Sequence, residues 1–319
     1  MRCGDDAVWL NENGNRVIAV ANPYTPLLNY FQKNNLNVKA LKARNYLDII
    51  TVVKLVRIFR ENNVQAIHLH RTQDLVVALM AADLADVPNR VLTLRMESKR
   101  SKKDIYHRWA YSRLTNVLTI TERMKGLVRK NIAVNAEKVK VLYNGYDLEK
   151  LKSEAVGPDE IRVKWGIPAD AFVAGIVGRL EEGKGQHLLL KAVRQLIDKI
   201  PNLYIMIVGD ETINRKGELA RLKKTVTEFR LSARVKFTGF QSPPGIIVPA
   251  FDVSVLASKK ETFGGVLVEA MALGVPVIGS NAGGVPEIIE HGLDGLLFKT
   301  EDQADLANSV YKLFLTFPT

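Results

Sequence analysis

The sequence predicts an α/β protein made of two Rossmann-like domains, each a parallel sheet with helices on both faces. The length of 319 residues suits about two domains of ordinary size. Short apolar runs rich in β-branched residues alternate with longer helical patterns along nearly the whole chain. A polar stretch near the middle, with two prolines and two glycines within residues 150–170, separates two such series.

The first series contains six runs that we expect to be strands, at residues 17–21, 38–41, 66–69, 91–94, 117–120 and 139–142. The second contains six more, at residues 172–177, 204–208, 235–237, 253–256, 276–279 and 295–298. Between the strands lie helical patterns, as where Ile49, Val52, Val53 and Val56 recur at helical spacing. Strands and helices that alternate in this way form the doubly wound class.

We place the linker within residues 150–170, which gives an N-terminal domain of residues 1–155 and a C-terminal domain of residues 156–319. A ligand is expected in a crevice between the two domains, lined by the carboxyl ends of strands.

The composition is that of an ordinary globular protein, with 47% hydrophobic and 25% charged residues. The single cysteine, Cys3, excludes an intrachain disulfide, which fits a reducing cytoplasm. No apolar core of signal-peptide length opens the chain, and no uncharged apolar run of about 18 residues occurs. We therefore expect no segment that spans a bilayer.

The net charge of +11 is concentrated in residues 98–130. That segment contains ten basic residues: Lys99, Arg100, Lys102, Lys103, Arg108, Arg113, Arg123, Lys125, Arg129 and Lys130. Only Asp104 and Glu122 oppose them. Such an excess attracts an anionic membrane surface or a charged glycan, or else it is only a solvated helical face. Nucleic acid is the least favoured partner.

A glycine-rich turn follows the strand that ends at Val177, and a helix begins near Gln186. This arrangement directs free backbone N–H groups at an anion, and Arg179 and Lys184 add positive charge as a diphosphate requires. The turn also approaches the pattern of a P-loop. A P-loop needs Ser or Thr after its lysine to bind Mg²⁺, whereas Gly185 follows Lys184, so a nucleoside triphosphatase is disfavoured.

A pair of glutamates flanks the start of another helix. Glu261 lies in the loop after the 253–256 strand, Gly264 and Gly265 open the helix, and Glu269 follows Glu261 by eight positions. Glu269 shares an apolar helical stripe, so its carboxylate needs a polar partner, and sugar hydroxyls are suitable ones. One carboxylate could then bind a hexose and the other a ribose, with a diphosphate between them.

These motifs resemble the retaining glycosyltransferases of family 4, which have the GT-B fold. The resemblance rests on the E-x7-E spacing, the segment AMALGVPVIGSNAGGVPEII after it, and GRLEEGKG at residues 178–185. Further matching segments are HLHRTQD (68–74), YNGYD (143–147), IVGDE (207–211) and VKFTGF (235–240). The resemblance covers roughly residues 7–315 and is most specific in the second half.

The resemblance implies a role for each motif residue. Arg179 and Lys184 would bind the donor diphosphate, Glu261 would bind the transferred sugar, and these three would form the catalytic set. Glu269 would bind the ribose hydroxyls. The other donor-binding positions would be Gly178, Gly239, Phe240, Phe263, Gly264, Gly265 and Val266, with Gly239 and Phe240 near the base. The departing diphosphate would receive the acceptor proton, and neither a metal nor a cofactor beyond the nucleotide sugar would be needed.

The acceptor side is expected at His70 and Arg95. His70 ends a strand on the crevice side, although a packed or solvated histidine would fit the same position. Many relatives have a histidine where Arg95 stands, and this departure favours an anionic acceptor.

The resemblance also implies truncation at both ends. In the family, a first strand and a Gly-Gly loop precede a helix like the one at which this chain begins, and a final helix follows the point where it stops. We therefore expect weak donor binding and little or no transfer by this chain.

Together these patterns predict transfer of a hexose-type sugar from a nucleotide-sugar donor to a glycan or lipid-linked acceptor of the lipopolysaccharide type. The protein would be cytoplasmic, with peripheral binding to the inner face of the membrane. Two alternatives stay open: a truncated form that binds nucleotide sugar but is inactive, and a nucleotide-sugar 2-epimerase. A dehydrogenase is disfavoured, because no G-x-G-x-x-G motif follows a strand.

Overall fold

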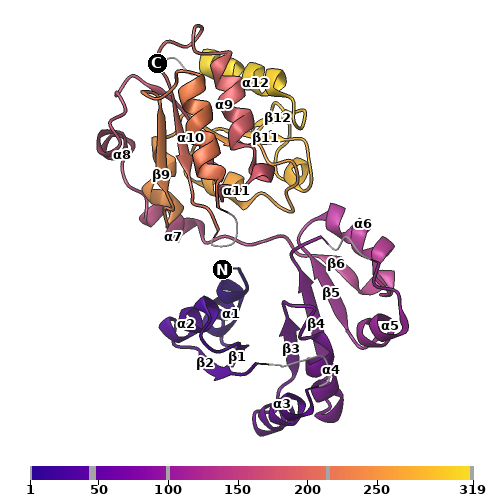
Figure 1. Ribbon diagram of the computed structural model, residues 1–319. Coiled ribbons are helices and arrows are strands. Elements are labelled where there is room, and N and C mark those ends of the chain that lie inside the picture. The colour runs from indigo at the N-terminus through magenta and orange to yellow at the C-terminus, as the bar shows by residue number, and fades with distance from the viewer. Residues whose placement is uncertain (1, 43–47, 98–100, 213–215, 317–319) are drawn as a thin grey trace. The chain divides into compact units, whose positions relative to one another are not determined.

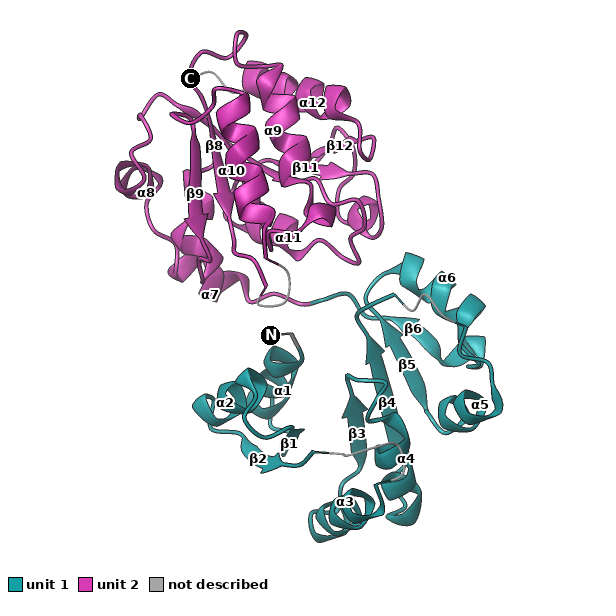
Figure 2. Cartoon of the chain, in the orientation of Figure 1, with its two compact units in different colours: residues 1–144 teal, residues 145–319 magenta. Residues whose placement is uncertain are grey.

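The structure is a computed structural model that describes residues 2–42, 48–97, 101–212 and 216–316. The chain divides into two compact units, residues 1–144 and residues 145–319 (Figure 2). The boundary expected at residue 155 lies inside the second unit. The reason is that helix α7 (Leu148–Ser153) packs against α11 (Gly265–Ala272), and the backbone N–H of Val156 donates to the carbonyl of Gly245 at 3.0 Å.

Unit 2 contains one sheet of six parallel strands. These are β7 (Phe172–Val177), β8 (Leu203–Val208), β9 (Val235–Gly239), β10 (Val253–Leu256), β11 (Val277–Ser280) and β12 (Leu296–Phe298). Their spatial order is β12-β11-β10-β7-β8-β9. The chain adds β8 and β9 on one side of β7, then returns to add β10, β11 and β12 on the other side. The predicted doubly wound sheet is therefore confirmed in this unit.

Helices cover both faces of this sheet. On one face lie α9 (Gln186–Arg194), α10 (Glu218–Glu228) and α12 (Gln303–Thr316) (Figure 1). On the other face lie α11, α8 (Pro158–Lys164) and the short helix η4 (Val248–Ala250), and η3 (Pro244–Ile246) packs against η4 and α7. Alternate residues of β7 serve the two cores: Ala174 and Ile176 belong to one apolar cluster and Val173 belongs to the other. This alternation requires a strand that is apolar throughout, as the sequence of β7 is.

Unit 1 contains two parallel sheets within its described residues, where one sheet per domain was expected. Strands β1 (Ile18–Ala21) and β2 (Asn37–Ala40) pair with each other. The other four pair in chain order: β3 (Ala66–Leu69), β4 (Asn89–Leu94), β5 (Asn116–Thr119) and β6 (Val139–Val141). Among the described strands, β1, β2, β3 and β6 each keep one unpaired edge.

The helices of unit 1 are α1 (Arg2–Glu12), α2 (Pro26–Lys33), α3 (Ile49–Glu61), α4 (Leu75–Leu84), α5 (Ile105–Ser112) and α6 (Glu122–Asn131). Helix α3 lies where its periodicity predicted it, but its buried face differs from the expected stripe. Val52, Leu55 and Phe59 are buried, whereas Ile49 and Val53 are 68% and 62% exposed. Burial follows the side with Leu55 and Phe59, whose larger side chains remove more apolar area from water. No helix in the described ranges is long and apolar enough to cross a membrane.

Candidate functional site

The strand order of unit 2 reverses between β7 and β10. Connections leave these two neighbouring strands toward opposite sides of the sheet, and open α/β sheets bind their ligands at the carboxyl ends of such strands. The glycine-rich turn, residues 178–185, follows β7 at this point. The loop that contains Glu261 follows β10 at the same point. The topology therefore brings together the two motifs that the sequence singled out.

Backbone contacts hold the two loops against each other. The N–H of Lys259 donates to the carbonyl of Gly183 at 3.0 Å. Gly185 has a φ of +81°, and a Cβ atom there would overlap the carbonyl of Ala257. Only glycine combines this left-handed conformation with so close an approach. Lys184 is therefore held next to the loop after β10.

An ion pair joins these loops. The Lys184 ammonium lies 2.8 Å from a carboxylate oxygen of Glu261, and the two side chains are only 23% and 18% exposed. The Ser258 hydroxyl donates to the same Glu261 oxygen at 3.4 Å, and the N–H of Thr262 donates to the other at 3.2 Å. The sequence motifs assigned Lys184 and Glu261 to the same donor ligand, but they did not predict that these two residues contact each other.

A third loop, which follows β11, contacts the backbone of Glu261. The N–H of Gly284 donates to the Glu261 carbonyl at 3.0 Å. Gly283 has a φ of +63°, and a Cβ atom there would overlap that same carbonyl. The glycine pair is visible in the sequence, but its contact with Glu261 could not be read from it. The position of Glu261 is thus fixed by the loop after β11 as well as by its own.

Helix α11 begins beside Glu261. Gly264, with a φ of +104°, precedes the helix, which starts at Gly265, while Phe263 is buried. The first N–H groups of a helix lack intrahelical partners and favour an anion. Glu269 lies on α11 one turn after Gly265 and is half-buried, as its apolar stripe predicted.

Arg179 lies at the same end of the sheet but is more open to solvent. Its side chain is 61% exposed, and its guanidinium lies 3.1 Å from the carboxylate of Glu181. Its carbonyl accepts a hydrogen bond at 3.0 Å from the amide of Gln186, which is buried at the first position of α9. Gln186 positions the loop backbone, a role for which the sequence contained no signal.

The residues expected near the base lie at the end of the edge strand β9. Gly239 has a φ of +67°, and its carbonyl accepts from the N–H of Gly209 at 2.8 Å. The next residue, Phe240, is 73% exposed. An exposed aromatic ring beside a polar loop can stack on another flat ring.

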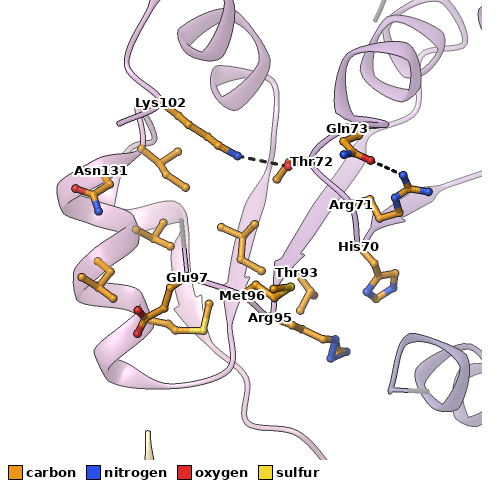
Figure 3. Close-up of a pocket in the computed structure, with 15 residues that line it drawn as sticks. His70, Arg71, Thr72, Gln73, Thr93, Arg95, Met96, Glu97, Lys102 and Asn131 are labelled. Atoms are coloured by element: carbon orange, nitrogen blue, oxygen red, sulfur yellow. Dashed lines mark hydrogen bonds between the residues drawn. The ribbon is translucent and has the colours of Figure 1, made fainter. Parts of the chain in front are cut away.

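The residues expected on the acceptor side lie in unit 1, where Figure 3 shows His70 and Arg95 pointing to the same side of a pocket. The His70 ring lies 4.2 Å from that of His68, and its Nδ1 is buried without a hydrogen-bond partner in the described chain. Burial, reinforced by His68 and Arg95, lowers the pKa of His70 to about 3. His70 is therefore neutral at physiological pH and suited to hydrogen bonding rather than charge pairing.

Arg95 already has a carboxylate partner. It pairs with Asp6 of α1, and it donates to the side-chain carbonyl of Asn144 at 3.1 Å. This arrangement weakens the expectation that Arg95 by itself attracts an anionic acceptor, because Asp6 offsets its charge.

The pocket of Figure 3 has a volume of about 560 Å³ and lies at the carboxyl ends of β3 and β4, beside α6. Its polar lining comes mainly from the ends of β3 and β4 and the loops after them, with Asn131 at the end of α6: His70, Arg71, Thr72, Gln73, Thr93, Arg95, Glu97, Lys102 and Asn131. Apolar side chains line it mainly on the helix side: Leu94, Met96, Met124, Leu127, Val128 and Ile132. A volume of this size is typical of sites for small molecules.

Several basic residues of the 98–130 segment form ion pairs within the protein. Arg113 pairs with Asp83 at 2.6 Å, Lys125 with Glu122 at 3.1 Å and Arg123 with Glu97 at 3.4 Å. Lys103 and Arg108 are exposed, as is the neighbouring Ile105 at 86%. Lys99 and Arg100 lie outside the described residues.

Comparison with known proteins identifies the family of both halves. The model of the glycosyl transferases group 1 matches residues 158–316, and that of glycosyltransferase family 4 matches residues 7–150. The D-inositol 3-phosphate glycosyltransferase of Corynebacterium jeikeium is 32% identical over 198 residues, or 56% of this chain and 47% of that protein. This chain thus spans about half the length of that relative.

A longer match covers most of the chain. The UDP-Gal:alpha-D-GlcNAc-diphosphoundecaprenol alpha-1,3-galactosyltransferase of Escherichia coli is 27% identical over 279 residues, or 83% of this chain and 70% of that protein. Among solved structures, Anabaena Alr3699/HepE in complex with UDP is similar with a TM-score of 0.85 and 26% identity. That similarity covers 97% of this chain and 85% of the Anabaena chain.

Proposed function

This chain belongs to glycosyltransferase family 4, with the GT-B fold, and we propose that it transfers a hexose-type sugar from a nucleotide-sugar donor to a glycan or lipid-linked acceptor of the lipopolysaccharide type. We propose further that the transfer retains the configuration of the anomeric carbon.

The observation that carries this proposal is the arrangement of Lys184, Glu261 and the start of α11 at the switch point of the unit 2 sheet. A nucleotide sugar presents a diphosphate flanked by two sets of hydroxyl groups. The site offers a cation and free helix N–H groups for the diphosphate, with carboxylates nearby for hydroxyls. The UDP complex of the similar Anabaena protein supports the same class of donor.

In the proposed binding mode, Arg179 and Lys184 contact the diphosphate together with the backbone at Gly178, Gly264 and Gly265. Glu261 accepts hydrogen bonds from the transferred sugar, which lies against Phe263 and Val266. Glu269 accepts hydrogen bonds from the ribose, and the base lies near Gly239 and Phe240. The Lys184 ammonium must turn from Glu261 toward the diphosphate, or contact both, when the donor binds.

The reaction needs no nucleophile from the protein. The bond between the anomeric carbon and the diphosphate oxygen breaks, and the acceptor oxygen bonds to that carbon on the same face. The acceptor proton passes to the departing diphosphate oxygen. The cationic side chains and the N-terminus of α11 stabilise the negative charge that develops on the diphosphate.

The acceptor side of the proposal rests on unit 1. A neutral His70 can exchange hydrogen bonds with an acceptor hydroxyl. Exposed Lys103, Ile105 and Arg108 together suit peripheral binding to an anionic membrane surface, where a lipid-linked acceptor would be located.

A thermal-shift screen of UDP-, GDP- and ADP-sugars tests the proposal, because a ligand that binds the folded state raises its melting temperature. Titration calorimetry with the best donor then compares Lys184→Ala and Glu269→Ala with the wild type. Loss of a charge-assisted contact is expected to cost about 1.5–3 kcal/mol, or roughly tenfold to a hundredfold in Kd.

Matched controls are Lys191→Ala and Glu228→Ala, which remove exposed charges on α9 and α10 and should leave the affinity unchanged. Equal affinities in all four variants would refute the proposed donor site. Product analysis with and without an acceptor then distinguishes transfer from epimerisation of the donor.

A further inference from the structure

The pocket of unit 1 combines an apolar wall with one half-buried ammonium group. Its apolar side chains are Leu94, Met96, Met124, Leu127, Val128 and Ile132. Facing them, the Lys102 side chain points across the pocket toward Thr72 (Figure 3), and its Nζ lies 3.4 Å from the Thr72 hydroxyl. A site with both features suits a ligand that is anionic at one end and apolar at the other.

The backbone of Lys102 is fixed. Its N–H donates to the carbonyl of Asn131 at 2.8 Å, and its carbonyl accepts from the N–H of Ala133 at 3.1 Å. These bonds tie the loop before α5 to the end of α6, so that the position of the ammonium depends on α6 itself. The backbone of Lys102 is thus held in place by the wall of the pocket, unlike that of a lysine in an unsupported surface loop.

The ammonium of Lys102 has no acidic partner in the described part of the chain. Other charges on the rim do have partners: Glu97 pairs with Arg123 at 3.4 Å, and Arg71 pairs with Asp74 at 3.6 Å. Burial without a compensating carboxylate lowers the pKa of Lys102 from its ordinary value. An anion bound there would restore the lost solvation of the charge.

The apolar wall continues to the outside of the pocket. Met96 lines the pocket although 81% of its surface is exposed, and Leu127 on α6 is half-exposed. An alkyl chain that starts at Lys102 can therefore contact the accessible side chains of Leu127 and Met96. The pocket of about 560 Å³ has room for an anionic group and the first methylenes of such a chain.

We propose that this pocket binds a phosphate-bearing amphiphile, with its phosphate against Lys102 and its alkyl or prenyl chain against Leu127 of α6 and Met96. A phosphate can accept hydrogen bonds from the Lys102 ammonium and from neighbouring hydroxyl and amide donors, here Thr72 and Asn131. This inference rests on the proposed function, because it names the class of lipid-linked acceptor that the chain would use.

The test is titration calorimetry with hexyl phosphate and octyl phosphate, both kept monomeric, alongside inorganic phosphate and octanol. The affinity is expected to rise with chain length, by up to about fourfold for each methylene that becomes buried. Inorganic phosphate should bind at least tenfold more weakly than octyl phosphate. If inorganic and octyl phosphate bind alike, the apolar wall plays no part and the proposal fails.

Variants separate the two halves of the site. Lys102→Met should weaken octyl phosphate about tenfold or more and leave octanol unaffected, while Lys102→Arg should retain most of the affinity. The matched control is Lys103→Met, which removes the adjacent exposed charge outside the pocket. Equal losses in Lys102→Met and Lys103→Met would mean general attraction by the basic segment and would refute a specific site. Leu127→Ala should weaken octyl phosphate more than inorganic phosphate.

The same variants are titrated with the nucleoside diphosphate of the best donor. Unchanged nucleotide affinity in Lys102→Met is expected, since the donor residues lie in unit 2. A chain that binds the nucleotide but shows no preference for alkyl phosphates refutes the pocket and leaves the proposed function standing. A chain that binds octyl phosphate but no nucleoside diphosphate refutes the proposed donor site and leaves the lipid-phosphate pocket standing.

Discussion

The Lys184–Glu261 pair should stabilise unit 2 even before any donor binds. Replacing Lys184 by Met removes the ammonium 2.8 Å from the Glu261 carboxylate. The carboxylate, only 18% exposed, would then keep two weaker contacts, from Ser258 at 3.4 Å and from the N–H of Thr262 at 3.2 Å. A largely buried charge that loses its partner is destabilising, because the desolvation penalty remains.

The expected magnitude lies between two limits. Exposed ion pairs contribute about 0.2–1 kcal/mol, and breaking a fully buried pair costs about 3–5 kcal/mol. Since both side chains are less than a quarter exposed, we expect Lys184→Met to lower the free energy of unfolding of unit 2 by about 2 kcal/mol. Glu261→Gln should cost about 1.5 kcal/mol, and the double variant should cost less than the sum by about 1–2 kcal/mol.

The assay is urea unfolding followed by tryptophan fluorescence in a Trp9→Phe, Trp109→Phe background. Trp165 is then the only tryptophan, so that the signal comes from unit 2. The Lys259–Glu301 pair is the matched control, with the same 2.8 Å separation but side chains that are 57% and 60% exposed. A coupling energy for Lys184–Glu261 no larger than that for Lys259–Glu301 would refute the assignment of a largely buried bridge.

Three further outcomes follow from other parts of the structure. Gly185→Ala should destabilise unit 2 by more than about 1 kcal/mol and weaken nucleotide binding, because both the φ of +81° and the Ala257 carbonyl oppose a Cβ atom. Gly217→Ala, where only the φ of +109° is unfavourable, should cost less, and equal costs would contradict the close approach. The pKa of His70 is low in the folded state, so unfolding takes up a proton below about pH 6.5 and the free energy of unfolding falls on acidification. Between pH 7 and pH 5, His70→Gln should therefore lose about 1–2 kcal/mol less of its free energy of unfolding than the wild type does. Parallel stability–pH curves for the two proteins would show that His70 is not shielded from water. Vesicles rich in anionic lipid should bind the chain at low salt, and Lys103→Met with Arg108→Met should reduce that binding at least tenfold, while Lys191→Met should not; absence of binding at low salt would leave only a solvated basic face.

The positions of the strands and helices were largely predictable because they depend on local sequence patterns. All twelve expected strand positions contain strands, since each is a short apolar run bounded by turn residues. The helix starts at Gln186 and Gly265 were also predicted, because glycines mark the turns before them. These features depend on residues near one another in the chain.

Long-range pairings were not predictable in the same way. The Lys184–Glu261 pair joins residues 77 positions apart, and the Arg95–Asp6 pair joins residues 89 apart. The division of unit 1 into two sheets likewise depends on which strands pair, whereas the sequence shows only that each strand is apolar. The sequence assigned Lys184, Glu261 and Arg95 to ligands, whereas in the structure each of them pairs with an opposite charge of the protein itself.

The Lys184–Glu261 pair also predicts how the site should distinguish a nucleotide sugar from the bare nucleotide. A diphosphate that draws the Lys184 ammonium away leaves the Glu261 carboxylate with two long contacts, from Ser258 and the N–H of Thr262, and a sugar hydroxyl can then add a stronger hydrogen bond. The sugar should therefore add affinity through Glu261, by about 1–2 kcal/mol, or roughly five- to thirtyfold in Kd. In Glu261→Gln the neutral amide has less need of that hydroxyl, so the preference for nucleotide sugar over nucleoside diphosphate should shrink toward unity. Lys184→Met should instead weaken both ligands by a similar factor, because each contains the diphosphate. Calorimetric titration of each variant with both ligands measures the two ratios. A sugar preference that survives in Glu261→Gln but is lost in Lys184→Met would show that the roles of the two residues have been assigned the wrong way round.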